Sequence, residues 1–252
     1  MTVGLETLTA KRQPRRHGHT ESEITRRLIE AIFEERLPPG ERITESQLAE
    51  TFEVSRSVVR LSMSKLSEIG VFKKTPNLGY TIAAPTRSEA RMMLDLRQMI
   101  EPEMVRKIAK DHTDADVQSL WEHLDAENKA RECGDRSTLV RLSGEFHLKL
   151  AECSRNVYLV QMLTQLQVLT CLAILVHAER EVGCPRDEHS KIVQAIADHD
   201  GNRAAEEMKH HLQHIAEELQ LDVQRNEPSL ESAFQWLSHI QRQSETGSAT
   251  ES

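Results

Sequence analysis

The stretch LPPGERITESQLAETFEVSRSVVR (residues 37–60) carries the signals that decide the fold of the first part of the chain. Its Pro-Pro-Gly run ends a preceding helix. Thr44 stands three residues before Gln47, which is the spacing of a capping box at a helix start. A tight turn then leads to Ser55, which is placed to cap a further helix. The stretch therefore predicts a short helix between two longer ones.

The residues on either side extend this pattern. Apolar spacing predicts a first helix over 21–36 and a third helix that ends near Gly70. The apolar positions of the third helix are Val58, Val59, Leu61, Met63, Leu66 and Ile69. Two β-prone runs, 71–74 and 80–82, flank a Pro/Asn/Gly turn and predict a hairpin. Three helices followed by a hairpin form a winged helix-turn-helix, which we expect over residues 21–84.

The first turns of the third helix contain the side chains that suit DNA. Arg56 and Arg60 are four residues apart and share a face. Arginine reads guanine with two hydrogen bonds and also pairs with phosphate. Ser55 and Ser57 suit phosphate at a helix N-terminus, and Lys74 adds positive charge to the hairpin. An ordinary solvated face is the alternative interpretation of the arginines alone.

The charge distribution divides the chain into a basic N-terminal third and an acidic remainder. Residues 11–87 hold 14 basic and 10 acidic side chains, whereas the whole chain has a net charge of −8. The four cysteines form no C-x-x-C pair and no secretory signal is visible, so we expect a reduced cytoplasmic location.

Residues 156–176 carry no formal charge, but several glutamines and threonines interrupt them. A helix inside a bundle explains this segment better than a membrane span does, so no membrane partner is expected.

Everything after a junction at 84–87 has helical spacing, so the chain is expected to be mainly α-helical. The expected helices are 88–111, 114–132, 136–153, 156–181, 186–199 and 202–224. Residues 1–20 are interpreted as a flexible basic arm that either touches DNA phosphates or is merely solvated. A C-terminal extension, 226–252, is expected to be partly disordered, with one further amphipathic helix at 229–241.

The first part of the chain resembles the GntR family of regulators. The resemblance rests on LPPGERITESQLAE (37–50), VSRSVVR (54–60), LSEIGV (66–71) and PNLG (76–79). It implies that Ser55, Arg56, Ser57 and Arg60 face DNA, and that Gly79 lets the wing approach the minor groove. The chain departs from the family at Ser57-Val58, where Thr-Pro is frequent, and at Leu61-Ser62, where Glu-Ala is usual.

The second part resembles the FCD ligand-binding domain of the FadR-like branch of that family. The resembling pieces are LRQMIE (96–101), EFH (145–147), CSRN (153–156), HSKIVQAI (189–196) and MKHHL (208–212). The resemblance implies an antiparallel bundle of six or seven helices around a polar cavity, expected over residues 88–225. It also implies a homodimer.

Many members of that family hold a divalent metal through one Asp and three His. The resemblance places the histidines at His147, His189 and His211, and neutral imidazoles suit Zn²⁺ or Ni²⁺. The usual Asp position is Ser143 here, and serine is a poor ligand for these ions. Three alternatives follow: a three-His site completed by water or the effector, a substitute acid from elsewhere, or no metal.

Effectors of FCD domains are commonly small carboxylates, which the resemblance places against the metal or the histidines. Arg97 is the candidate to pair with a carboxylate, and a structural ion pair with Glu101 is the equal alternative. Ser143 and Asn156 are the other candidate effector-binding residues.

The sequence thus favours a DNA-binding regulator, expected to be a repressor that a small carboxylate releases from double-stranded operator DNA. It is not expected to be an enzyme. The alternative is a three-His metalloenzyme, a hydrolase or lyase, which needs a general base beside the metal. Glu207, one turn before His211, is the nearest acid in sequence.

Overall fold

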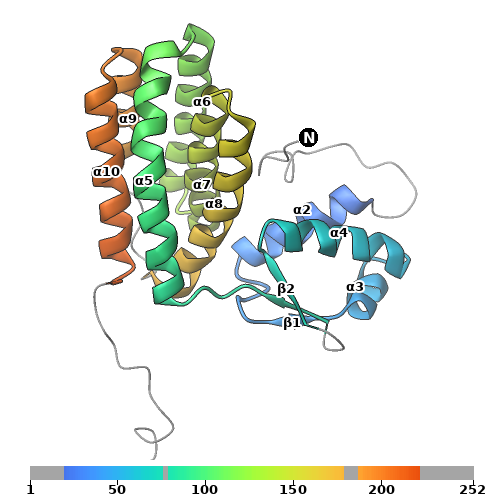
Figure 1. Cartoon of the computed structure of the whole chain (residues 1–252). Coiled ribbons are helices and arrows are strands. Elements are labelled where there is room, and N and C mark those ends of the chain that lie inside the picture. The colour runs from blue at the N-terminus through green and yellow to red at the C-terminus, as the bar shows by residue number, and fades with distance from the viewer. Residues whose placement is uncertain (1–19, 76–78, 179–186, 222–252) are drawn as a thin grey trace, which may run out of the picture. The chain divides into compact units, whose positions relative to one another are not determined.

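The computed structural model describes residues 20–75, 79–178 and 187–221, and Figure 1 traces its elements. The expectations for the N-terminal arm, the tip of the hairpin and the C-terminal extension with its helix at 229–241 fall outside these residues. The winged part contains helices α2 (Glu21–Phe33), α3 (Glu45–Thr51) and α4 (Arg56–Glu68). Its strands are β1 (Arg42–Ile43), β2 (Phe72–Thr75) and β3 (Gly79–Ile82). The expected three helices and hairpin are therefore confirmed.

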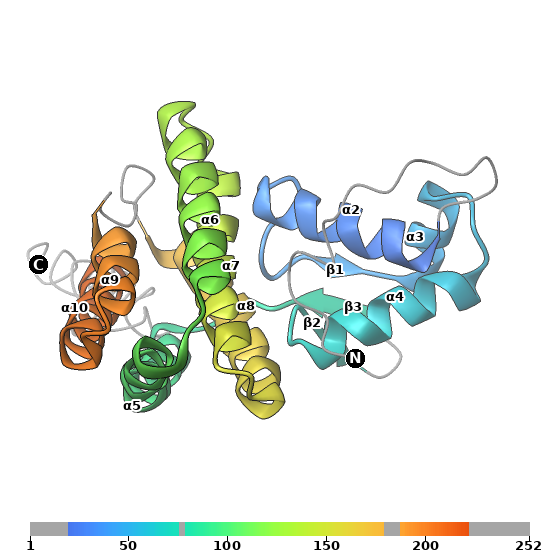
Figure 2. The same cartoon turned by 90° about the horizontal axis from the view of Figure 1, so that it is seen from above.

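The wing is a three-stranded antiparallel sheet in the order β1-β3-β2. Phe72 lies opposite Ile82 in the β2–β3 pair, and Ile43 lies opposite Tyr80 in the β1–β3 pair. In Figure 2 these strands lie beside α2, α3 and α4. Strand β1 was not predicted, because a strand of two residues is too short to show the alternation of apolar and polar residues that indicates a strand. Strand β1 lies between α2 and α3 in the chain and pairs with β3, so the start and the end of the winged part share one sheet.

The core of the winged part forms where α2 and α4 pack together. Ile24 and Leu28 from α2 and Val59, Met63 and Leu66 from α4 are all at most 2% exposed. These positions follow the predicted helical spacing. The prediction for one further position is wrong: the side chain of Leu61 is 63% exposed, because it lies on the side of α4 opposite the buried residues.

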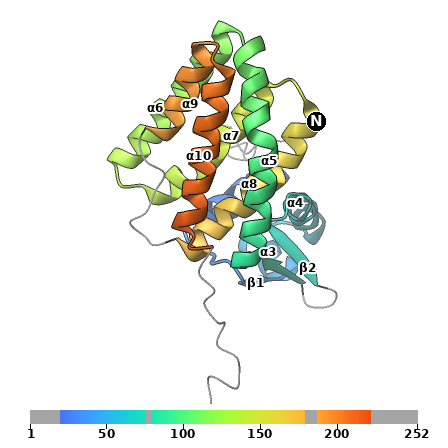
Figure 3. The ribbon, with the colours of Figure 1, turned by 60° about the vertical axis from the view of Figure 1, so that its left-hand side comes forward.

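The second part is a bundle of six helices among the residues that the structure describes. They are α5 (Arg87–Asp111), α6 (Asp114–Glu132), α7 (Arg136–Cys153), α8 (Val157–His177), α9 (Glu188–Ala197) and α10 (Gly201–Glu218). Helix α10 packs along α5, α7 packs between α6 and α8, and α9 contacts α6 and α10. Figure 3 shows α5 and α10 side by side. The expected mainly helical class is confirmed, although α8, α9 and α10 end earlier than expected.

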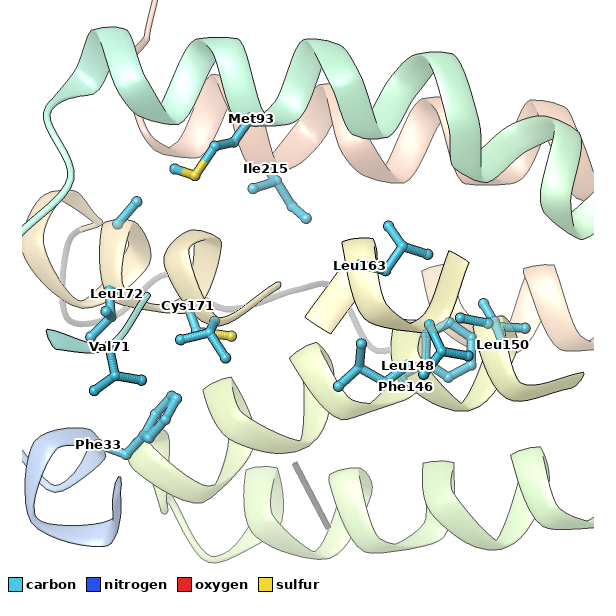
Figure 4. Close-up of a cluster of buried hydrophobic side chains, with 14 of the residues drawn as sticks. Phe33, Val71, Met93, Phe146, Leu148, Leu150, Leu163, Cys171, Leu172 and Ile215 are labelled. Atoms are coloured by element: carbon cyan, nitrogen blue, oxygen red, sulfur yellow. The ribbon is translucent and has the colours of Figure 1, made fainter. Parts of the chain in front are cut away.

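Capping residues determine where these helices start, and buried side chains pack the helices against one another. Thr86 with Glu89 and Thr113 with Asp116 form capping boxes at the starts of α5 and α6. Figure 4 shows part of the core, where Phe146 and Leu150 of α7 and Leu163 of α8 are fully buried. Burying such side chains stabilises the fold by roughly 1.5–3 kcal/mol each.

Helix α8 is long and apolar enough to cross a membrane by length and composition. Half of its most apolar window is nevertheless buried inside the protein. Gln167 and Thr164, two of the polar residues that interrupt it, are among the buried ones. Core helices of soluble proteins pass the same length test, and α8 packs against α5 and α7 as such a helix does.

Candidate functional site

Three histidines from three helices meet inside the bundle. His147 lies on α7, His189 on α9 and His211 on α10, and each is at most 3% exposed. The Nε2 atom of His211 lies 3.1 Å from Nε2 of His147 and 3.3 Å from Nε2 of His189. One ligand atom from each residue falls within 4.8 Å of the others. The structure therefore brings together the histidines that the family resemblance selected.

A carboxylate holds the other ring nitrogen of each histidine. His147 Nδ1 donates to Glu101 at 2.6 Å, and His211 Nδ1 donates to Glu188 at 2.8 Å. His189 Nδ1 donates to Glu127 at 3.0 Å. Ionised carboxylates only accept hydrogen bonds, so the proton of each imidazole is on Nδ1. The three Nε2 lone pairs consequently face one another.

Burial and charge keep this centre in a state that suits metal binding. Burial raises the pKa of Glu101, but the charges of Arg97 and His147 oppose it and hold that pKa at about 2. Burial lowers the pKa of His147 to about 4, although Glu101 pulls it upward. Burial, with the neighbouring imidazoles, also lowers the pKa of His211 well below its ordinary value. At neutral pH these imidazoles are neutral, which is the form that binds metals.

The donor set fits a divalent transition metal. At metal–nitrogen distances of about 2.0–2.1 Å, neighbouring nitrogens in a tetrahedral or octahedral shell lie roughly 2.8–3.4 Å apart. Two of the three Nε2–Nε2 distances, 3.1 and 3.3 Å, agree with this spacing, and the three ligand atoms all lie within 4.8 Å of one another. Histidine ligands held at the second nitrogen by a carboxylate are the usual arrangement around bound metals. Three facing lone pairs without a cation between them would repel one another.

Ser143 lies beside this centre, where the family resemblance placed it. It lines a pocket together with His147, His211 and Arg97. The pocket encloses about 570 Å³, its mouth included. The buried Ser143 hydroxyl makes no hydrogen bond to any residue that the structure describes. A buried hydroxyl without a partner is costly, so this oxygen is available to a bound molecule.

The structure shows one of the two roles that the sequence left open for Arg97. Its guanidinium is 1% exposed and its Nε donates to Glu101 at 2.5 Å. With the Gln167 amide oxygen turned toward it, Nη2 donates there at 2.7 Å. The structural ion pair is therefore present, and Arg97 also lines the pocket. Asn156 is not brought to the pocket: it is exposed, and its side chain caps α8 by accepting from Tyr158 and Leu159.

The sequence did not reveal the three carboxylates that hold the histidines. Glu101 was predicted only as an ion-pair partner, and Glu127 and Glu188 were not singled out. Each lies on a different helix from the imidazole that it holds: Glu101 on α5, Glu127 on α6 and Glu188 on α9. Glu207, the acid nearest in sequence to His211, does not line the pocket.

The candidate DNA-facing residues lie at the exposed start of α4. Ser55 occupies the N-cap position as predicted, but its hydroxyl does not bond the helix backbone. It lies 2.8 Å from the Ser57 hydroxyl instead. Arg56 begins the helix and is exposed. The structure thus places three polar side chains together at one helix N-terminus, where the backbone N–H groups attract anions.

The second arginine is held in place by an acid that the sequence analysis missed. Arg60 is exposed, and its Nε and Nη2 donate to Glu45 of α3 at 3.2 and 3.0 Å. Tyr80 of the wing also donates to Glu45, at 3.4 Å. The hydrogen bond from Arg60 is the main reason why the pKa of Glu45 is lowered. Lys74 is exposed on β2, with its ammonium 5.7 Å from the Tyr80 ring centre.

Gly79 has a structural reason to be glycine in addition to the role that the resemblance gives it. Its φ of +90° is in the region that residues with side chains rarely adopt. A Cβ at this position would lie 2.8 Å from the Ile43 carbonyl oxygen. Glycine therefore allows β3 to start against the backbone of β1.

Comparison with known families agrees with this architecture. The model described as bacterial regulatory proteins, gntR family, matches residues 20–81, and the FCD domain model matches residues 92–214. An uncharacterized HTH-type transcriptional regulator of Bacillus subtilis, YdhC, is 27% identical over 195 residues, covering 76% of this chain and 87% of that protein. The transcriptional repressor RspR of Escherichia coli is 25% identical, covering 75% and 84%.

Solved structures share the fold. A GntR regulator from Rhodococcus sp. RHA1 superposes with a TM-score of 0.69 at 20% identity, covering 79% of this chain and 97% of that one. Escherichia coli McbR also gives 0.69, at 19% identity, covering 80% and 97%. The related proteins are transcriptional regulators, which favours regulation over the metalloenzyme alternative. This chain belongs to the GntR family and is a DNA-binding transcriptional regulator with an N-terminal helix-turn-helix and a C-terminal FCD domain.

Proposed function

We propose that this protein is a cytoplasmic repressor that leaves its operator when a small carboxylate binds beside a metal held by His147, His189 and His211. The observation that carries the proposal is the set of three buried imidazoles, each fixed by a carboxylate, next to a pocket. Zn²⁺ and Ni²⁺ suit the imidazole donors. When bound, the metal would supply positive charge for an anionic effector.

The pocket offers a carboxylate two further groups. The Ser143 hydroxyl has no partner among the described residues and can donate to an oxygen of the effector. Arg97 contributes its charge, although Glu101 and Gln167 already occupy part of its guanidinium. We therefore assign Arg97 to long-range attraction of the carboxylate and Ser143 to direct contact.

Two measurements on full-length protein without a histidine tag test this function. Metal analysis should find close to one equivalent of Zn²⁺ or Ni²⁺ per chain, and less than about a tenth would contradict the metal centre. A screen of small carboxylates should then find one that releases the protein from a selected operator. A carboxylate that strengthens the complex instead would contradict the repressor role but leave effector binding intact.

Replacing Ser143 with Asp is expected to raise the affinity for Zn²⁺ by about tenfold or more, since a carboxylate is a far better ligand than a hydroxyl. Ser143 lines the pocket with two of the three histidines, so the new carboxylate starts beside them. Competition with a zinc-binding dye measures the affinity. Ser143→Ala is the control and should leave it near the wild-type value. Equal affinities for all three proteins would show that position 143 does not reach the metal.

Arg56→Ala is expected to weaken specific operator binding by about 1–3 kcal/mol, because Arg56 is exposed at the start of α4, where we place the DNA. Gel-shift titration at one fixed salt concentration measures this change. Arg203→Ala is the control: it removes a half-exposed arginine, paired with Asp198, from α10 in the bundle. If the two variants bind alike, α4 does not present Arg56 to DNA.

We also propose that the regulator acts as a homodimer and that α5 provides part of the contact. Met92, Leu96 and Met99 follow one another at helical spacing and are 60%, 38% and 78% exposed. An apolar stripe of this kind is typical of an interaction surface. Sedimentation velocity of the full-length protein at micromolar concentration measures the assembly, and a monomer would contradict the proposal.

A further inference from the structure

Leu61 is an exposed apolar side chain on a helix whose other exposed residues are mainly polar. Its side chain is 63% exposed. Ser57 and Ser64, four residues before it and three after it, are exposed on the same side of α4. Val59, Met63 and Leu66 form the buried side. Leu61 therefore contributes nothing visible to the core and faces away from it.

The surroundings of Leu61 argue against a protein–protein contact. Such contacts use contiguous apolar patches, whereas Leu61 is bordered by Ser57, Ser64 and the Arg60–Glu45 ion pair. This polar setting, together with Arg56 five residues earlier at the start of α4, matches a helix that enters the major groove of DNA. The apolar group that base edges present in that groove is the C5-methyl of thymine.

We infer that Leu61 reads a thymine methyl group in each half of the operator and so helps to determine its sequence. The inference rests on the proposed role of α4 as the DNA-facing helix. Arg56 and the serines supply polar contacts, which hold the helix in the groove. Leu61 adds selectivity for thymine over cytosine at the base pair that it covers, because cytosine lacks the methyl group and presents an amino group at that edge.

A methyl-deletion cycle with full-length protein tests this directly. An operator is first selected from random double-stranded DNA, and each thymine is then replaced in turn by uracil, which removes only the methyl group. Wild-type protein should lose about three- to fivefold in affinity at one thymine per half-site, the effect of uncovering one methyl group. Leu61→Ala should bind the thymine operator more weakly and should show no further loss at the uracil position.

Two comparisons make the result decisive. Val157→Ala shortens another apolar side chain, 55% exposed on α8, and should keep the wild-type response to uracil. Circular dichroism melting should show that Leu61→Ala keeps its fold. If wild type is insensitive to uracil, or if Leu61→Ala keeps the same sensitivity, the inference is overturned. If Arg56→Ala also binds DNA normally, the failure extends to α4 as the DNA-facing helix.

Discussion

Full-length protein carrying His211→Ala is expected to bind Zn²⁺ at least about a hundredfold more weakly than wild type. His211 is the central ligand, since its Nε2 lies 3.1 and 3.3 Å from the other two. Removing a carboxylate that holds a ligand typically costs 10–100-fold in metal affinity, and removing the ligand itself should cost more. Competition titration with a chromophoric chelator measures the affinity on tag-free protein.

The neighbouring His210 provides a matched control. It precedes His211 on α10 but its side chain is 70% exposed. His210→Ala should therefore leave Zn²⁺ affinity within about twofold of wild type, because this exposed histidine supplies no ligand and its Nδ1 lies 3.6 Å from the Glu188 oxygen that does not hold His211. Glu127→Gln, which weakens the support of His189, should fall between the two variants. Equal affinity for His210→Ala and His211→Ala would place the metal elsewhere or nowhere.

Only part of this site could be predicted from the sequence. The family resemblance selected the three histidines, and they do converge. Sequence spacing could not show that Glu101, Glu127 and Glu188 hold their second nitrogens, because the partners in all three pairs lie on different helices. Helical periodicity reports which side of a helix is buried, but it says nothing about which buried acid meets which histidine.

The winged part shows the same division between local and distant signals. The capping box of Thr44 and Gln47 is read within four residues, and it is present as predicted. The ion pair between Arg60 and Glu45 connects α4 to α3 across the turn between them, and no spacing rule predicts it from the sequence. Apolar spacing placed Leu61 among the apolar positions of the third helix. Its exposure became visible only when the packing of α2 fixed which side of α4 is covered.

Glu101→Ala is expected to lower the free energy of unfolding by about 3–5 kcal/mol. Arg97 and Glu101 form an ion pair whose side chains are 1% and 0% exposed. Removing one partner leaves the other charge buried without compensation, which is the costly way to break such a pair. Urea denaturation in the presence of a chelator measures the change, so that any loss of bound metal does not contribute to it.

Two further variants separate the ion pair from a general effect of substitution on α5. Glu103→Ala removes a half-exposed acid paired with Arg106 and should cost at most about 1 kcal/mol, as surface pairs do. Arg97→Met combined with Glu101→Leu removes both charges, so it should be less destabilising than Glu101→Ala alone. If the double variant is the less stable of the two, the loss comes from packing or from the support of His147, and the buried charge of Arg97 is not its cause.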